Sequence, residues 1–249
     1  MNAEYLKELA ARYNNKSFIE KDPVSFPHKY TEKRDIETAA FVAQWFAYGK
    51  REAFLKILND FALEISSPYL YIKNQGYRTF KDDNSCLYRF YKKNDFFHLC
   101  NALHHLYFIE GKGEMDFEQV VLQRLKQNFN EESFSCEKVL SEIISLFANV
   151  KGIPQNLSSA CKRLCMFLRW MVRQDNIVDF GLWTLIAPTD LIIPVDTHVY
   201  HQALALGLTS RKSADFKTAK EITENLKNIF PDDPLLGDFA LFGFGVNNK

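Results

Sequence analysis

The sequence predicts an all-α protein. Apolar residues recur at spacings of three and four along most of the chain, as at Ile36, Ala40 and Ala43, which places them on one face of a helix. Alternating apolar and polar runs between turn pairs, which are typical of strands, are nearly absent. A chain of 249 residues that is 47% hydrophobic and 14% aromatic can bury a substantial core. We therefore expect a single helical domain over residues 1–249, formed by two closely packed helical lobes.

Each predicted helix runs from one turn signal to the next. Proline and glycine interrupt the helical pattern at Asp22-Pro23, Phe26-Pro27, Gly111, Gly113, Ile153-Pro154 and Ala187-Pro188. In chain order, the predicted helices are residues 3–13, 35–48, 50–65, 95–109, 116–129, 136–149, 158–173, 197–206, 215–229 and 234–244.

The composition argues against several classes of protein. The 31 basic and 31 acidic residues cancel, so the molecule as a whole is not a nucleic-acid-binding polycation. No stretch approaches about eighteen uninterrupted apolar residues, and we expect neither a membrane span nor a signal peptide. The odd number of scattered cysteines favours free, buried thiols in a reducing compartment, so we expect a cytoplasmic protein. No cysteine or histidine spacing predicts a metal site or a bound cofactor, and a monomer is the default expectation.

One segment of this neutral chain is locally basic. No acidic residue lies between Ile143 and Gln174. The basic residues in this interval are Lys151, Lys162, Arg163, Arg169 and Arg173. Projected at about 100° per residue, Lys162, Arg169 and Arg173 share one side of a helix with Met166 and Trp170. The alternative is that this stripe is simply solvated surface.

Two further signals lie at helix starts. Ser158 and Ser159 precede the basic helix, where their hydroxyls could cap it and its free amides could bind a phosphate. Farther along, an apolar run from Leu191 ends at Asp196, which lies at the start of a predicted helix. An aspartate at this position, taken alone, would be interpreted as an N-cap.

The segment Pro194-Val195-Asp196-Thr197-His198 resembles the PVD-x-H segment of 8-oxoguanine DNA glycosylases and the VDTH segment of endonuclease III. In those families this aspartate is catalytic, and bifunctional members carry a catalytic lysine near the start of the helix after the DNA-binding hairpin. Lys162 occupies the matching place, slightly farther from the aspartate. The resemblance implies a helix-hairpin-helix DNA glycosylase fold with a cleft between two lobes, and a hairpin and catalytic segment at about residues 150–210.

Longer stretches resemble an uncharacterised bacterial family related to the archaeal 8-oxoguanine glycosylases. They are DPVSFPHKYTEKRDIETAAFVAQWFAYGKR, ACKRLCMFLRWMVR and LIIPVDTHVYHQALALGLTSRK, and the similarity spans most of the chain. Two features depart from the pattern. The hairpin around Gly152-Ile153-Pro154 lacks the LPGVG-type glycines, and no cysteine follows Cys165 to form an iron-sulfur cluster.

The Lys162 and Asp196 pair suits the cleavage of a base-sugar bond. A carboxylate stabilises the positive charge that develops on the sugar, and a neutral lysine amine attacks the sugar carbon to form a Schiff base. Burial, Arg163 and Arg169 nearby, and the positive end of a helix would each lower a lysine pKa. The Schiff base can then eliminate the 3′ phosphate, so weak nicking at abasic sites is expected.

The resemblance also implies contacts to a flipped base and its backbone. Asp238 would supply a polar contact and Phe242, four residues later, a stacking ring, unless Phe242 is simply core. Trp170, Trp183 and Tyr48 are further aromatic candidates, and Gln44 could read a base edge. Ser158, Ser159, Arg163 and His198 would contact DNA, although a lone histidine on a helix is more often structural.

Three hypotheses follow. The first is a base-excision repair glycosylase with lyase activity, acting on an oxidised purine such as 8-oxoguanine in duplex or single-stranded DNA, without metal or cofactor. The second keeps the fold as a catalytically inactive nucleic-acid-binding module. The third is a helical interaction protein whose basic face over residues 151–173 binds an acidic partner. Modest, salt-sensitive DNA affinity near Lys151, Arg163, Lys212 and Lys217 would argue against the third.

Overall fold

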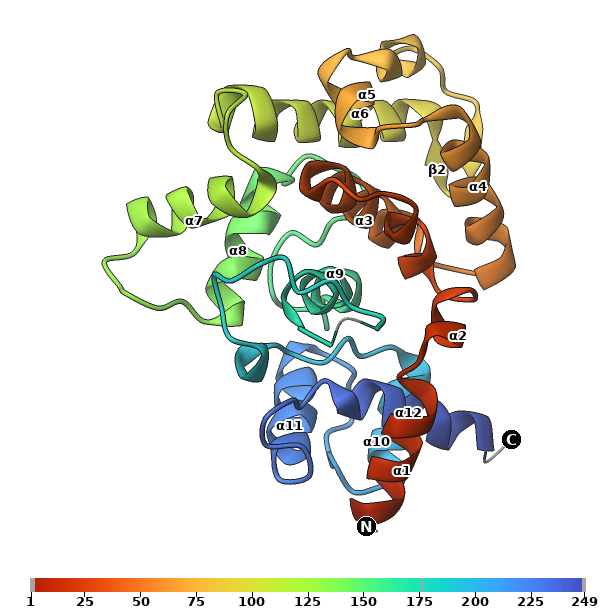
Figure 1. Ribbon diagram of the computed structural model, residues 1–249, viewed down its shortest axis with the longest axis vertical. Helices are drawn as coiled ribbons and strands as arrows, with labels where there is room; N and C mark the ends of the chain where they lie inside the picture. The colour runs from red at the N-terminus through yellow and green to blue at the C-terminus, as the bar shows by residue number, and fades with distance from the viewer. Residues whose placement is uncertain (1–2, 176, 248–249) are drawn as a thin grey trace. The chain divides into compact units, whose positions relative to one another are not determined.

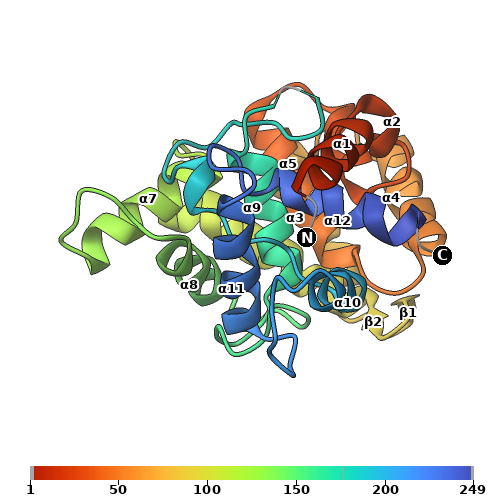
Figure 2. The ribbon, with the colours of Figure 1, turned by 90° about the horizontal axis from the view of Figure 1, so that it is seen from below.

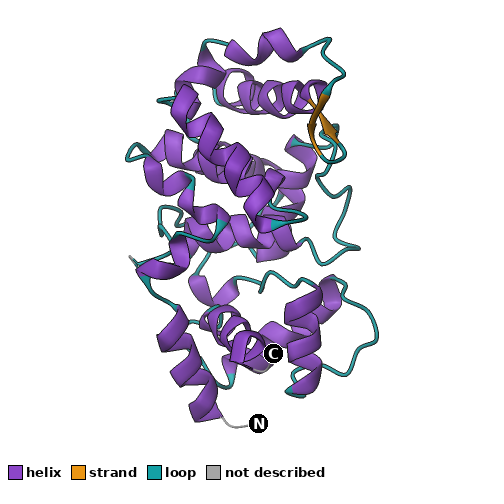
Figure 3. Cartoon of the chain, turned by 90° about the vertical axis from the view of Figure 1, so that its right-hand side faces the viewer, coloured by secondary structure: helices purple, strands orange, loops and turns teal. Residues whose placement is uncertain are grey.

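A computed structural model describes residues 3–175 and 177–247, and these are mostly helical (Figure 1). The α-helices are α1 (Ala3–Tyr13), α2 (Lys16–Ile19), α3 (Lys33–Phe46), α4 (Arg51–Glu64), α5 (Pro68–Lys73), α6 (Lys93–His105), α7 (Phe117–Asn128), α8 (Cys136–Leu146), α9 (Lys162–Val172), α10 (Thr197–Ala205), α11 (Phe216–Lys227) and α12 (Leu236–Asn247). A small antiparallel pair, β1 (Cys86–Tyr88) and β2 (Tyr91–Lys92), is drawn in orange in Figure 3. The predicted all-α class is confirmed.

Shorter turns connect these helices. Single turns of 3-10 helix are η1 (Pro23–Ser25), η2 (Pro27–Lys29), η3 (Gly76–Phe80) and η5 (Pro188–Asp190), and η4 (Leu106–Glu110) continues α6 as a π-helical turn. Contacts divide the chain into two compact units. The first contains the described residues of Met1–Lys21, Ser135–Leu140 and Asn156–Lys249, and the second contains Asp22–Phe134 and Ser141–Gln155.

In the first unit, the N-terminal helix packs against the C-terminal one. Figures 1 and 2 both show α1 beside α12, and α10 also contacts α12. Leu6 and Leu9 on α1 are buried, as their helical spacing predicts. The approach is close at Gly243, where an added Cβ would lie 2.3 Å from a ring carbon of Tyr13. A glycine at this position therefore lets the two helices meet.

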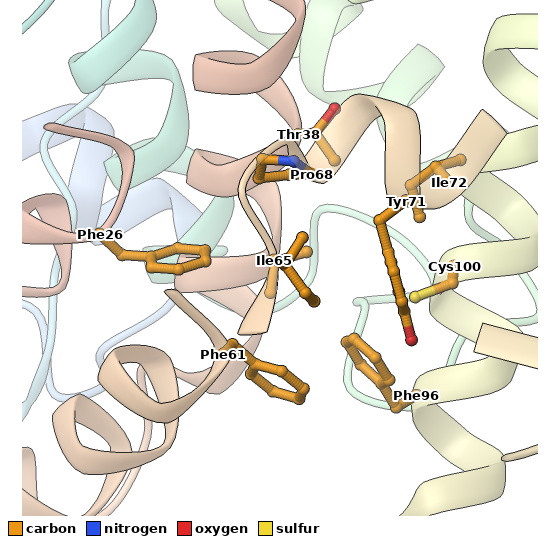
Figure 4. A pocket seen from close by; sticks show the side chains of 10 residues that line it. Phe26, Thr38, Phe61, Ile65, Pro68, Tyr71, Ile72, Phe96 and Cys100 are labelled. Atoms are coloured by element: carbon orange, nitrogen blue, oxygen red, sulfur yellow. The ribbon is translucent and has the colours of Figure 1, made fainter. Parts of the chain in front are cut away.

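In the second unit, α3 is the central helix. Every residue from Ile36 to Phe46 is buried, so α3 is covered on all sides rather than along one stripe. A small apolar pocket lies between α3, α4, α5 and α6. Figure 4 shows the rings of Phe61, Tyr71 and Phe96 around it, with the Cys100 thiol beside them. Burial raises the pKa of the Cys100 thiol well above its ordinary value.

Several predicted boundaries shift in the structure. The helix predicted from residue 158 begins at Lys162, and the one predicted to end at 149 ends at Leu146. Helix α5 was not predicted from the sequence. Ser67 caps it by accepting a hydrogen bond from the Leu70 amide at 3.1 Å. The β1–β2 hairpin was not predicted either, because its strands are too short to show an alternating pattern.

The cysteines are free in the part of the chain that the structure describes, as predicted, and four of the five are buried: Cys100, Cys136, Cys161 and Cys165. Cys86 is exposed, contrary to the expectation of buried thiols. Among the described residues no helix combines the length and apolar character that a membrane crossing needs.

Candidate active site

Lys162 lies on the first turn of α9. The helix starts there because the preceding residue, Cys161, has left-handed backbone angles, φ 49° and ψ 29°, which end any helical run before it. No side chain caps the helix. The Ser159 hydroxyl instead accepts a hydrogen bond from the Cys161 amide at 3.4 Å, and the Ser158 amide bonds to the Asn156 side chain. The prediction that these serines cap the helix is therefore wrong.

Asp196 is the N-cap of α10, as its sequence context indicated. A buried extended segment from Leu191 to Val195 leads to it, and the Ile193 amide in this segment donates to the Thr223 hydroxyl at 3.0 Å. One carboxylate oxygen of Asp196 accepts the Val199 amide at 2.8 Å, which leaves the other oxygen available to a second partner.

That second partner is Lys162. Its Nζ lies 3.2 Å from Oδ2 of Asp196, with side-chain exposures of 36% for the lysine and 33% for the aspartate. Burial on its own would raise the pKa of the Asp196 carboxyl, but Lys162 and the Val199 amide hold it below its ordinary value. The structure thus brings together two residues that are far apart in sequence and that sequence reasoning had already paired.

A second carboxylate, Asp238 on α12, lies within electrostatic reach of this pair. It accepts a hydrogen bond from Nη1 of Arg169, and its side chain is 14% exposed. The pKa of Asp238 is raised to about 6, mainly by burial and also by the charge of Asp196, while Arg169 and Lys162 oppose the rise. Asp238 was predicted as a polar contact for a base, and the structure places it next to the predicted catalytic residues.

Arg169 on α9 and Arg173, which directly follows this helix, are not on a solvated face. Arg169 and Arg173 are 3% and 1% exposed. Nε of Arg169 donates to Asp179 at 3.2 Å, and Nε of Arg173 donates to Asp233 at 2.8 Å. Nη1 of Arg173 also donates to Asp179, at 2.8 Å, and the carboxylates around it raise its pKa. The interpretation of residues 151–173 as an exposed basic face is therefore wrong at Arg169 and Arg173, because carboxylates that follow Gln174 in the sequence contact them. The other basic residues of the segment, Lys151, Lys162 and Arg163, keep exposed surface.

Three of the aromatic residues predicted to hold a base are packed, and they are Phe242, Trp170 and Trp183. Phe242 meets Tyr13 and Phe18 edge to face, at ring distances of 5.4 and 5.3 Å. Trp170 is fully buried, and its indole nitrogen has no hydrogen-bond partner among the described residues. The prediction that Trp170 faces a base does not fit this structure, because its ring has no accessible surface. Trp183 is fully buried as well.

Gln44 lies in the second unit, on α3, and it is completely buried. Neither its amide nitrogen nor its oxygen has a hydrogen-bond partner within the described part of the chain. Burying an amide without hydrogen-bond partners is unfavourable. Gln44 therefore has a donor and an acceptor that the fold does not use. It is not open to a base edge in the conformation described.

The remaining predicted DNA contacts are accessible to different degrees. Ser158, Ser159 and His198 are exposed, and Arg163 is half-buried. His198 contributes electrostatically to lowering the pKa of Asp196. Among the described residues no cluster of three or more histidine, cysteine or acidic side chains could hold a metal ion.

The predicted hairpin belongs to the second unit and is internally bonded. The Ile153 amide donates to the Val150 carbonyl at 3.1 Å. Gly152 has φ +89°, and the Tyr91 hydroxyl occupies the space that a side chain there would need. Nζ of Lys151 donates to Asp95 at 2.8 Å. The polar groups of this loop are therefore used in contacts within the protein.

Sequence reasoning missed the carboxylates that surround the two arginines, Asp175, Asp179 and Asp233, and the rings of Tyr13 and Phe18 on Phe242. A signal was present in the acidic stretches QDNIVD and PDDPLLGD, which follow a segment with no acidic residue. Two groups of opposite charge, each at a helix boundary, are candidates to pair when the chain folds.

No functionally curated protein and no solved structure shows a significant match to the chain. A family model, described as Protein of unknown function (DUF2400), matches residues 22–247, which include both Lys162 and Asp196 and leave out α1 and α2. The chain belongs to this family.

Proposed function

We propose that the protein is a DNA glycosylase with associated lyase activity, of the helix-hairpin-helix type, and that Lys162 and Asp196 carry the reaction. The observation that supports this most is the 3.2 Å approach of the lysine Nζ to a carboxylate held as an N-cap. The resemblance around Asp196 suggests the substrate class, an oxidised purine such as 8-oxoguanine in DNA.

In the proposed reaction, the bond between the base and C1′ of the sugar breaks, and its electron pair leaves with the base. The Lys162 ammonium gives a proton to the departing base, so the amine becomes neutral when it must act as a nucleophile. Asp196 stabilises the positive charge on the sugar. The amine then bonds to C1′, the ring opens to a Schiff base, and loss of a proton from C2′ releases the 3′ phosphate.

Asp238 is the proposed polar contact to the base. With a pKa raised to about 6, its carboxyl group is partly protonated near neutral pH and can donate as well as accept a hydrogen bond. Phe242 as a stacking ring and Gln44 as a reader of the base edge complete the proposal, and both require local rearrangement because they are packed in the unliganded chain.

The test is borohydride trapping on duplexes that carry 8-oxoguanine, uracil or an abasic site. Wild-type protein, Lys162→Gln and Asp196→Asn are compared, with Lys7→Gln as a control because Lys7 is an exposed lysine on α1, outside the predicted DNA contacts. The proposal requires a covalent adduct with the wild type and with Lys7→Gln and none with Lys162→Gln. Trapping by Lys162→Gln at wild-type level would refute the assigned nucleophile.

A second candidate is a nucleic-acid-binding module without catalysis, in which the closed hairpin changes the ligand. The loop at Gly152 uses its amide and its lysine internally, so it does not offer the open backbone that a phosphate needs. Binding of all three duplexes without adduct or base release would favour this candidate over the first.

We further propose that the protein acts as a cytoplasmic monomer and needs no metal or cofactor. Its free thiols suit a reducing compartment. Adduct formation that is unchanged by EDTA, and a mass in solution equal to one chain, are the expected results.

A further inference from the structure

The β1–β2 hairpin turns through two residues, Arg89 and Phe90. Arg89 has φ 51°, in the left-handed region. Glycine is the usual residue where a two-residue hairpin turn needs a positive φ, and an arginine there is strained. Such strain persists only where the surrounding structure enforces it, and it often accompanies a functional surface.

The turn is held by a rigid aromatic support. The Tyr48 hydroxyl donates to the Tyr88 carbonyl at 3.0 Å, and the Tyr88 hydroxyl donates back to the Tyr48 carbonyl. The rings of Trp45 and Tyr91 are stacked at 3.7 Å, with planes 6° apart. These contacts tie both strands to the end of α3 and the residues after it.

Lys151 adds a polar tie to the same turn. Its Nζ donates to the Phe90 carbonyl and to the Asp95 carboxylate, and its own carbonyl accepts from the Trp45 indole at 2.8 Å. The backbone of the turn is therefore fixed from both sides.

This fixed turn presents an apolar ring to water. The Phe90 side chain is 73% exposed, and the Arg89 guanidinium lies 5.8 Å from its centroid and 5.6 Å from that of Tyr48. Gly49 lies directly against the guanidinium, since an added Cβ would be 2.5 Å from its Nη1. Single exposed apolar side chains are common on protein surfaces, so the exposure of Phe90 bears on function only together with the fixed turn that presents it and the cations beside it.

The charged side chains on this turn and on the strand after it, Arg89 and Lys92, are cationic, and Lys50 follows Gly49, which lies against the Arg89 guanidinium. Arg89 and Lys50 form no ion pair with any carboxylate of residues 3–175 and 177–247. Lys92 is exposed, and its Nζ contacts the Asn84 side-chain oxygen at 3.3 Å rather than a carboxylate. These cations therefore keep their charge available to an anionic partner.

We propose that the Arg89–Phe90 turn is a nucleic-acid contact, in which the Phe90 ring stacks against a base while Arg89, Lys50 and Lys92 face phosphates. Every base offers a π face to an aromatic ring, and cations beside the ring bind the backbone that carries the bases. A lipid surface fits less well, because membrane insertion needs a broader apolar face than one ring. The choice of DNA as the nucleic acid rests on the proposed function.

The experiment measures binding of labelled single-stranded and duplex DNA by fluorescence anisotropy, with the full chain carrying Lys162→Gln to prevent turnover. Added to this background, Phe90→Ala should raise Kd about tenfold, and Phe90→Trp should restore binding. Leu63→Ala is the matched control, because Leu63 is an apolar side chain that is 87% exposed on α4. It should leave Kd unchanged. Phe90 is exposed, so its replacement should not affect folding, and equal thermal melts check this.

The salt dependence separates the two parts of the contact. Lys50→Gln should reduce the slope of log Kd against log salt by about one, while Phe90→Ala should leave the slope intact. Equal Kd values for Phe90→Ala and its parent would overturn the proposal. So would Phe90-dependent binding to anionic vesicles with no binding to DNA, or the absence of any DNA binding.

Failure of this proposal can be told from failure of the proposed function. Phe90-dependent DNA binding by a protein that forms no borohydride adduct would leave this inference standing and remove the lyase assignment. If the wild type forms the adduct and Phe90→Ala binds DNA and is trapped as well as the wild type, this inference alone would be removed.

Discussion

Arg169 and Arg173, at the C-terminal end of α9, and Arg89, in the β1–β2 turn, differ in exposure. Arg169 and Arg173 come from the most basic segment of the sequence, yet they are buried among carboxylates. Arg89 comes from an unremarkable stretch, yet it is exposed beside Phe90 with no carboxylate partner in the described residues. The difference shows that local sequence charge does not identify a binding face. Partners that the fold brings in from elsewhere decide whether a positive charge reaches solvent.

The largest expected effect is the loss of a buried arginine. Arg173→Met removes a guanidinium that is 1% exposed and leaves the buried Asp179 and its neighbours undercompensated. We expect the free energy of unfolding to fall by about 3–5 kcal/mol. Urea denaturation at pH 7 measures it. If the free energy of unfolding falls by less than about 1 kcal/mol, the carboxylates around Arg173 reach water, and Arg173 would not differ from the exposed Arg89 as described.

The next effect is a pH dependence that comes from Asp238. Its folded pKa of about 6 lies above the ordinary 3.8, so the folded state holds this proton more tightly. The associated stability is present at low pH and is lost as pH rises from about 4 through 6. Between pH 4 and 7 the wild type should lose about 2–3 kcal/mol relative to Asp238→Asn. Parallel unfolding curves for the two proteins across this range would contradict the raised pKa.

Gln44 is a buried amide with no hydrogen-bond partner among the described residues. Gln44→Met keeps the approximate volume and removes two unsatisfied polar atoms. We expect the free energy of unfolding to rise by about 1–2 kcal/mol. Thermal or urea unfolding gives the value. A destabilised variant would show that Gln44 has a hydrogen-bonding partner, such as a bound water, in solution.

The smallest effects belong to the exposed cations. Lys162→Gln removes an ion pair whose two side chains are each about one third exposed, so the free energy of unfolding should change by less than about 1 kcal/mol. Arg89→Gly should leave stability equal or slightly higher, because glycine relieves the positive φ. Calorimetric melting of both variants checks this. A large loss for Lys162→Gln would show that the pair is structural.

The helical class and most helices could be predicted because apolar periodicity is a local property. Asp196 as an N-cap was also local, and its pairing with Lys162 came from resemblance rather than from spacing. The burial of Arg169 could not be predicted locally, because its partners, Asp179 and Asp238, lie after the helix and at the far end of the chain. The Arg89 turn was missed because a two-residue turn with an arginine at positive φ has no ordinary sequence signal.

The central claim is that Lys162 is the nucleophile, and the most direct measurement locates the adduct on the chain. Wild-type protein is trapped with borohydride on an abasic-site duplex, digested with protease and nuclease, and analysed by peptide mass spectrometry. We expect a sugar remnant on the peptide that contains Lys162. Modification of another lysine or of the N-terminal amine, or no adduct at all, would contradict it.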